Sequence, residues 1–173
     1  QSLPASLCEL NNLVYLLLGK NQLSQIPEEI DKLKNLQRLT VDQNALQSMP
    51  EALCTLHELT VLHLWGNQIT EIPAGIGNLK KLQELDLSSN LLKTVPVSIG
   101  ELHNLSLLFL WNNQLAEIPV EIGNLQNLTR LALNENQLEF IPSEIGSLGE
   151  LTELYLSGNK LQGVPTFIGN LKK

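Results

Sequence analysis

Three side chains near the middle of the chain, His63, Asp86 and Ser88, have the types that form a serine hydrolase triad. In such a triad the histidine takes the serine proton and the aspartate orients the histidine. The spacing argues against this chemistry, because Asp86 and Ser88 are two residues apart and lie roughly 7 Å apart along an extended strand. His63 is then expected opposite Asp86 and not between the pair, and no helix N-terminus or glycine turn is expected there to hold an oxyanion. We therefore predict that the chain is not an enzyme.

Metal and cofactor chemistry also lacks the residues it needs. No group of cysteines and histidines has the spacing of metal ligands. The sequence contains neither a phosphate-binding loop nor a dinucleotide fingerprint. We predict no metal and no small-molecule cofactor.

A fixed period of 23 residues decides where all these side chains lie. The stretch from Leu59 to Pro73 has the skeleton L-x-x-L-x-L-x-x-N-x-I-x-x-I-P, which recurs without insertion or deletion, and all eight prolines fall in one column. A fixed period of this length indicates a solenoid in which each repeat adds one coil. We predict one domain over residues 1–173, with a partial repeat at 1–12 and seven strand-bearing repeats that start at residues 13, 36, 59, 82, 105, 128 and 151.

Each repeat predicts a strand and a short helical turn. Apolar residues at the fourth and sixth positions alternate with variable ones, which indicates a strand with one buried face. All strands run the same way along the chain, so the sheet must be parallel. The proline that follows suits the first turn of a short helix or 3₁₀ segment. The asparagine between them is expected to bond backbone groups of its own and the adjacent coil.

The skeleton, followed by I-P-x-x-I-G-x-L, resembles the leucine-rich repeat in its 23-residue form. Similar repeats occur in the plant intracellular Ras-group-related proteins and in many bacterial proteins, some of them effectors delivered into host cells. The resemblance covers essentially the whole chain and implies an α/β fold. The expected fold is a right-handed horseshoe with the parallel sheet on its concave face and short helical or 3₁₀ turns on its convex face. Cys8, Asp31 and Cys54 depart from the glycine of the tail. The family's terminal caps are missing, so we expect a fragment of a longer protein.

The third, fifth and seventh positions of each repeat are expected to project from the concave sheet. Five of the seven aromatic residues fall among these 21 positions, where an even spread would place about one. Exposed tryptophan, tyrosine and arginine are typical anchors of protein interfaces. The candidate binding residues are Tyr15, Arg38, His63, Trp65, Glu84, Asp86, Phe109, Trp111, Arg130 and Tyr155.

The centre of this face is expected between Trp65 and Trp111, which stand about 10 Å apart across the small Ser88. We predict a slot there for an apolar or aromatic side chain, with Asp86 and His63 as polar contacts. Arg130 is also expected to pair with Glu153 on the adjacent strand.

Composition narrows the kind of partner. A net charge of −7 argues against nucleic acid and anionic membranes, which need a basic surface. No apolar run reaches the roughly 18 residues of a membrane helix, so no membrane insertion is expected.

The function predicted is a protein–protein interaction module that holds a protein partner on its concave face, as a bacterial effector or an intracellular signalling scaffold. One alternative is the substrate-recognition domain of a larger enzyme, such as a GTPase, kinase or ubiquitin ligase. Another is a cell-surface adhesin or structural scaffold. The expected location is the cytoplasm, or a host cell into which an effector is secreted.

Overall fold

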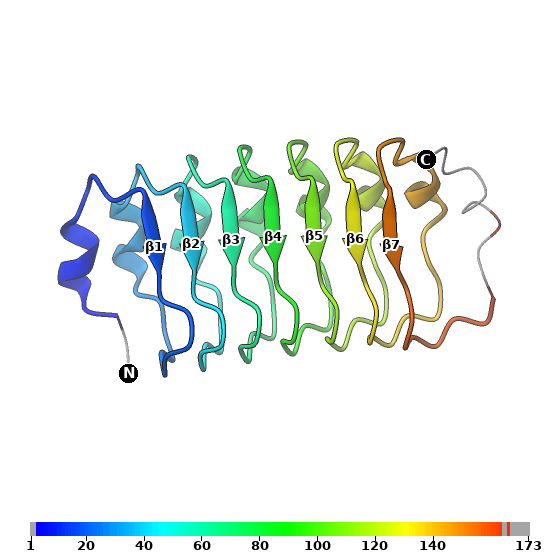
Figure 1. Ribbon diagram of the computed structural model, residues 1–173, viewed down its shortest axis with the longest axis horizontal. Coiled ribbons are helices and arrows are strands. Elements are labelled where there is room, and N and C mark those ends of the chain that lie inside the picture. The colour runs from blue at the N-terminus through cyan, green and yellow to red at the C-terminus, as the bar shows by residue number, and fades with distance from the viewer. Residues whose placement is uncertain (1–2, 164–165, 167–173) are drawn as a thin grey trace.

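The computed structural model describes residues 3–163 and residue 166, which form one solenoid of stacked coils (Figure 1). Each 23-residue repeat contributes one strand, and the first and last strands lie toward opposite ends of the molecule. Pro165 of the proline column and Phe167 lie outside the described residues.

The described residues contain a single sheet of seven strands, ordered as in the chain. Every neighbouring pair is parallel, and each residue pairs with the one 23 positions later, as Leu62 does with Leu85. This confirms the predicted parallel sheet. The strands are β1 (Tyr15–Leu17), β2 (Arg38–Thr40), β3 (Val61–His63), β4 (Glu84–Asp86), β5 (Leu107–Phe109), β6 (Arg130–Ala132) and β7 (Glu153–Tyr155).

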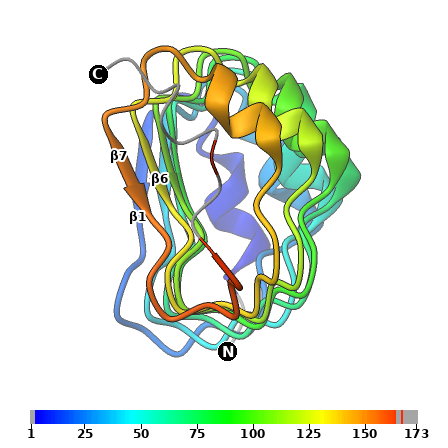
Figure 2. The same ribbon diagram turned by 90° about the vertical axis from the view of Figure 1, so that its right-hand side faces the viewer.

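Short 3₁₀ helices cover the side of the coils opposite the sheet (Figure 2). Each begins directly after a proline, whose fixed φ suits the first turn, and each ends where a leucine N–H bonds the carbonyl of the preceding isoleucine or leucine column. The predicted 3₁₀ turns are confirmed. They are η1 (Ala5–Glu9), η2 (Glu28–Lys32), η3 (Glu51–Thr55), η4 (Ala74–Asn78), η5 (Val97–Glu101), η6 (Val120–Asn124) and η7 (Ser143–Ser147).

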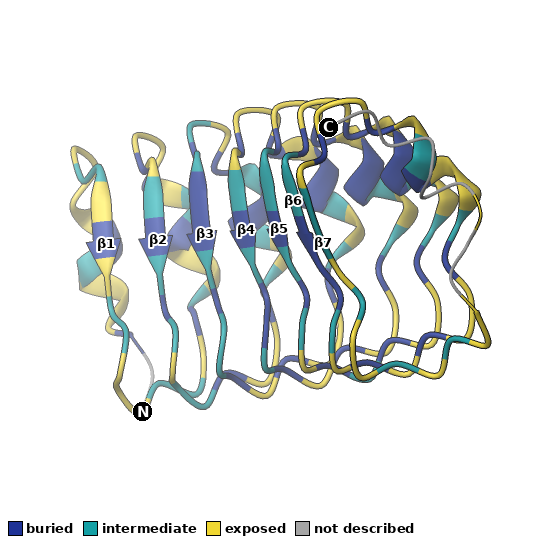
Figure 3. Ribbon diagram, turned by 45° about the vertical axis from the view of Figure 1, so that its right-hand side comes forward, coloured by how far each residue is buried: buried dark blue, intermediate teal, exposed yellow. Residues whose placement is uncertain are grey.

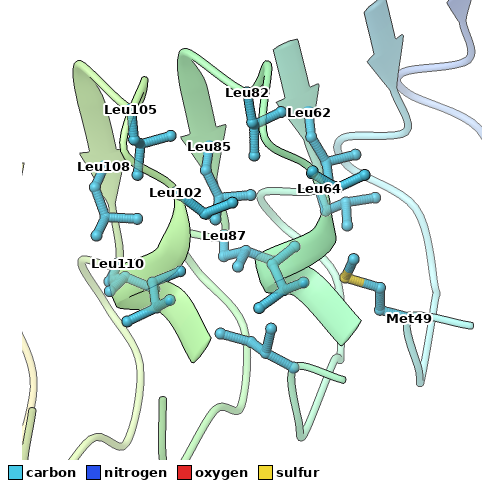
Figure 4. Close-up of a cluster of buried hydrophobic side chains, with 14 of the residues drawn as sticks. Met49, Leu62, Leu64, Leu82, Leu85, Leu87, Leu102, Leu105, Leu108 and Leu110 are labelled. Atoms are coloured by element: carbon cyan, nitrogen blue, oxygen red, sulfur yellow. The ribbon is translucent and has the colours of Figure 1, made fainter. Parts of the chain in front are cut away.

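The core fills the space between the sheet and the 3₁₀ helices (Figures 3 and 4). Leu62, Leu85 and Leu108, the middle residues of three adjacent strands, are fully buried, and so is Leu87, which follows β4. Burying one leucine side chain stabilises the fold by roughly 1.5–3 kcal/mol. One coil cannot enclose its own leucines, so the stability of the solenoid depends on stacking between coils.

A ladder of asparagines joins each coil to the one before it. Asn90 donates its Nδ2 to the Leu87 carbonyl of its own coil, at 3.1 Å, and to the Leu64 carbonyl of the preceding coil, at 3.0 Å. Its Oδ1 accepts the Ile69 N–H at 2.9 Å. These bonds satisfy buried main-chain groups at the turn, where the ladder of the sheet has ended. The predicted ladder is confirmed, and Asn44, Asn67, Asn113, Asn136 and Asn159 make bonds of the same kind.

The residue before each ladder asparagine has a left-handed backbone. Gly66 has φ 69° and Gly158 has φ 68°, as glycine readily allows. Five other coils place a residue with a side chain in this conformation, and these are Lys20, Gln43, Ser89, Asn112 and Glu135. The asparagine can reach both coils only if the chain turns sharply just before it, so the turn is kept even where the residue is unfavourable.

Glycines of the I-G-x-L tail let neighbouring 3₁₀ helices approach closely. A Cβ added to Gly123 would lie 2.7 Å from the Glu144 Cβ and 2.8 Å from the Glu144 carbonyl oxygen. Cys54 occupies the same column but faces Gly75 in the next coil, where an added Cβ would lie 3.0 Å from the Cys54 Cβ. The close contact therefore needs a glycine on one of its two sides. Between η5 or η6 and the next helix the earlier helix supplies it, whereas between η3 and η4 the later helix supplies it, as Gly75. Cys54 is a free, buried cysteine, and burial raises its pKa to about 12.

Candidate binding face

The concave face of the sheet carries the side chains that project away from the core. It consists of the first and third residues of each strand and the second residue after the strand, and we call these positions the concave wall. All ten residues predicted from the sequence lie on this wall, and they are Tyr15, Arg38, His63, Trp65, Glu84, Asp86, Phe109, Trp111, Arg130 and Tyr155. The sheet thus brings them to one surface, although they are spread over seven coils.

An open space of about 410 Å³ lies on the wall around β6, and we call it the aromatic hollow. It exists because Ala132 is small and pairs in register with Phe109 on one side and Tyr155 on the other. The hollow is lined by Phe109, Trp111, Arg130, Ala132, Asn134 and Tyr155. Sequence reasoning missed Ala132 and Asn134. The signal that could have found them is an alanine between two aromatic residues in one column.

The slot expected between Trp65 and Trp111 is not where the open space lies. Ser88, its expected floor, is fully buried, so the surrounding side chains leave no opening above it. Trp111 borders the hollow on its other side, whereas Trp65 does not line it. Tyr15 and Arg38 also lie outside the hollow, near the first strands of the sheet.

An ion pair holds one edge of the hollow in place. Arg130 Nη2 donates to Glu153 Oε1, which is the pairing predicted from the sequence, and the Tyr155 hydroxyl donates to Glu153 Oε2 at 2.6 Å. The hydrogen bond from Arg130 lowers the pKa of Glu153, and the carboxylate in turn raises the pKa of Tyr155. One carboxylate therefore orients the guanidinium and the phenol that line the hollow, which reduces the ordering needed when a partner binds.

An acidic pair lies two strands away from the floor of the hollow. Glu84 and Asp86 begin and end β4, and the Glu84 Oε1 lies 3.0 Å from His63 Nε2. The Asp86 Oδ1 accepts the Ser88 N–H at 3.0 Å. Burial raises the pKa of Asp86, although the hydrogen bonds from Ser88 and the nearby His63 oppose that rise.

His63 lies opposite Asp86 in the register of the sheet, as the sequence predicted, but its side chain approaches Glu84. His63 pairs with Glu84, because the diagonal neighbour on the parallel strand comes within its reach. No hydrogen bond joins His63 to Ser88 in the part of the chain that the structure describes. The three triad-type residues therefore do not form a proton relay.

The described residues offer neither a metal site nor a membrane-spanning helix. Residues 3–163 and 166 contain no group of three histidine, cysteine, aspartate or glutamate side chains placed to hold a metal ion. Within the same residues, no helix has the length and apolar character needed to cross a bilayer.

Known proteins are similar to this chain in both sequence and structure. A family model described as a leucine-rich repeat region matches residues 3–91 and 96–173, and a leucine-rich repeat model matches residues 81–102. Comparison with curated proteins gives no match.

Three solved structures illustrate the likeness. A leucine-rich-repeat protein of Leptospira interrogans has 38% identity and a TM-score of 0.96, with 99% of this chain and 44% of that chain covered. The plant peptide hormone receptor RGFR1, solved in complex with RGF2, has 34% identity and a TM-score of 0.90, with 98% of this chain and 28% of the receptor covered. The internalin InlF of Listeria monocytogenes has 26% identity and a TM-score of 0.87, with 99% of this chain and 49% of that chain covered.

The chain thus spans less than half the length of these three proteins. Its fold agrees with theirs, with TM-scores from 0.87 to 0.96, and the family model covers nearly all of its residues. The chain belongs to the leucine-rich-repeat family, whose fold generally serves protein–protein interaction.

Proposed function

We propose that the chain binds a protein partner on its concave wall, with the aromatic hollow at the centre of the contact. The observation that carries this proposal is the hollow itself, an apolar space bordered by Phe109, Trp111 and Tyr155 on a surface that faces solvent. Exposed aromatic rings clustered around an open space mark a site where another molecule can bury them.

The composition of the hollow favours a protein over a small molecule. It is wide open to solvent, whereas small-molecule sites enclose most of their ligand. Aromatic anchors with an arginine at the edge are typical of protein interfaces. The plant receptor with the same fold, solved with a peptide hormone, supports a peptide or protein as the occupant.

A second candidate is the recognition part of a longer protein. This chain corresponds to between 28% and 49% of the length of each of the three similar structures, so the coils here correspond to a portion of each. In such a protein the concave wall selects the target and other segments act on it. The wall plays the same part in both candidates.

The test compares three single variants that each remove one aromatic side chain. A partner captured by the wild-type chain is identified, produced separately, and measured against each variant by calorimetry. Trp111→Ala should weaken binding by about 2 kcal/mol, which is roughly thirtyfold, because it removes a wall of the hollow. Trp65→Ala should cost less.

Phe140→Ala serves as the matched control, because Phe140 is 71% exposed but does not line the hollow. Its affinity should equal that of the wild type. A partner that binds Trp111→Ala as tightly as the wild type would overturn the proposal.

A further inference from the structure

The acidic pair Glu84–Asp86 and the aromatic hollow lie at a fixed separation on the same wall. We propose that the partner contributes an extended segment that places an apolar side chain in the hollow and a lysine or arginine side chain beside Glu84 and Asp86, three residues away. This inference rests on the proposed function and specifies the chemistry of the partner.

The acidic pair lacks a permanent cation of its own. The contact made by Glu84 is with His63, and Asp86 accepts a main-chain N–H, so neither carboxylate meets a lysine or arginine in the described residues. Glu153 on the same wall is, by contrast, already paired with Arg130. A partially buried carboxylate without a cation is costly, and a cation from a partner reduces that cost.

Ser88 does not supply the positive charge that Asp86 lacks. It is fully buried next to Asp86, and its hydrogen bonds to the carboxylate lower the pKa of Asp86 without neutralising the charge. The negative charge of Asp86 is therefore open to a cation from the partner.

The register of the sheet gives the separation. Asp86 pairs with Phe109, and Phe109 pairs with Ala132, so the acidic pair and the floor of the hollow are two strands apart. Parallel strands are spaced about 4.8 Å, which makes this distance roughly 10 Å. A polyproline II segment rises about 3.1 Å per residue and has three residues per turn. Its side chains at positions i and i+3 point the same way and lie about 9 Å apart.

The sheet also excludes the common alternative, in which a peptide adds a strand. β4, β5 and β6 are each paired on both sides, so they offer no free edge for main-chain hydrogen bonds. Side chains must therefore carry the recognition, and a segment that crosses the strands needs no backbone pairing. Aromatic-lined surfaces suit such segments.

The experiment uses two synthetic peptides that differ only in the charged residue. Both are flanked by glycines, and their centres are Arg-Pro-Pro-Leu and Glu-Pro-Pro-Leu. Binding to the 173-residue chain is followed by NMR through the indole N–H signals of its two tryptophans. The arginine peptide should bind at least about tenfold more tightly than the glutamate peptide, with the larger shift at Trp111.

Asp86→Asn should remove most of this tenfold preference, since the amide keeps the size of the side chain but not its charge. Asp42→Asn is the matched control, because it removes the same charge from another part of the wall. The Asp42 carboxylate lies against Gly19, where an added Cβ would be 2.7 Å from its oxygens, and therefore points away from Asp86. The control should keep the preference.

Equal affinity for the two peptides, or no binding of either, would overturn this inference. The proposed function would stand in both cases, because it fails only if Trp111→Ala retains full affinity for the protein partner. A preference that persists in Asp86→Asn would also overturn the inference, since the cation would then lie elsewhere.

Discussion

The turn after each strand carries a buried asparagine that bonds two coils, whereas the concave wall just before it carries a different side chain in nearly every coil. Asn90 is 5% exposed and bonds residues of the preceding coil through both ends of its amide. Tyr155 on the wall is 47% exposed, and its hydroxyl donates a hydrogen bond to Glu153 on the same strand. A residue that satisfies buried main chain cannot change without cost, while a residue that faces solvent can be exchanged to suit a partner.

If the ladder asparagines stabilise the fold and the wall residues do not, removing a ladder asparagine should lower the stability of the chain. Asn90→Ala leaves the buried Ile69 N–H without its partner and removes one of two hydrogen bonds from the Leu64 carbonyl, which keeps the bond from Asn67 Nδ2. Because an unsatisfied buried group costs about 1–3 kcal/mol and a lost hydrogen bond about 1 kcal/mol, the unfolding free energy should fall by about 3 kcal/mol. Urea unfolding followed by circular dichroism measures this loss.

Asn21→Ala is the control for the ladder. Asn21 is exposed and its side chain donates to Leu18 and Gly19 of its own coil only, so the loss should stay below about 1 kcal/mol. Similar losses in the two variants would show that the bonds between coils add nothing.

Filling the hollow should affect binding and not folding. Ala132→Leu places a larger apolar side chain in the space of about 410 Å³, so partner affinity should fall about thirtyfold while unfolding changes by less than about 1 kcal/mol. Thr40→Leu enlarges the same column on β2, outside the hollow, and should leave affinity unchanged. A loss of affinity in both variants would mean that the hollow is not the centre of the contact.

The close contact between 3₁₀ helices should, like the asparagine ladder, contribute to the stability of the fold. In Gly123→Ala the new Cβ meets Glu144 backbone, so the coils must move apart and stability should fall by about 2 kcal/mol. Gly149→Ala is the control, since an added Cβ there meets nothing within 4 Å. Thermal unfolding distinguishes them, and equal melting temperatures would refute the close-contact role of Gly123.

The left-handed turn should show a smaller effect. Gly66→Ala forces a Cβ into a backbone with φ 69°, which costs about 1 kcal/mol. Ser89→Gly makes the opposite change at the same position of the next coil and should be neutral or slightly stabilising in urea unfolding. A loss in both variants would mean that this turn is not strained.

The repeated parts of the fold could be predicted from the sequence because the same residue type recurs at the same position of each repeat. The alternation of apolar residues predicted the strands, the recurring proline predicted the 3₁₀ helices, and the recurring asparagine predicted the ladder. The left-handed turn was missed because Lys20, Gln43 and Glu135 carry no glycine signal, even though the turn recurs in every coil.

The centre of the candidate site could not be predicted in the same way. The sequence placed it over Ser88, since serine is small, but the position of an open space depends on how neighbouring side chains lean. Ala132 lies within its strand between two large rings and leaves a space, whereas Ser88 follows its strand and is covered. Likewise, His63 approaches Glu84 and not Asp86 because of its side-chain rotamer, which the residue types of the repeat do not predict.

The smallest effect expected is at Asp86, where binding and stability should oppose each other. Burial raises the pKa of this carboxyl in the folded chain, so the unfolded chain releases the proton more readily. Stability is then lost as pH rises from the ordinary aspartate pKa of about 3.9 through the raised folded value, and it stays reduced at neutral pH. Asp86→Asn should therefore be slightly more stable than the wild type at neutral pH, and this advantage should vanish below the ordinary pKa.

Urea unfolding at neutral pH and below the ordinary aspartate pKa measures the difference in stability between Asp86→Asn and the wild type. Asp42→Asn is the control, because it removes the same charge elsewhere on the wall. A less stable Asp86→Asn at neutral pH would mean that the hydrogen bond from the Ser88 N–H outweighs the burial of the charge. With the arginine peptide bound, the order should reverse, because the cation stabilises the ionised carboxylate and the wild type gains more from the ligand. A side chain that lowers the stability of the free chain and raises that of the complex is the opposite of Asn90, whose contribution is complete before any partner arrives.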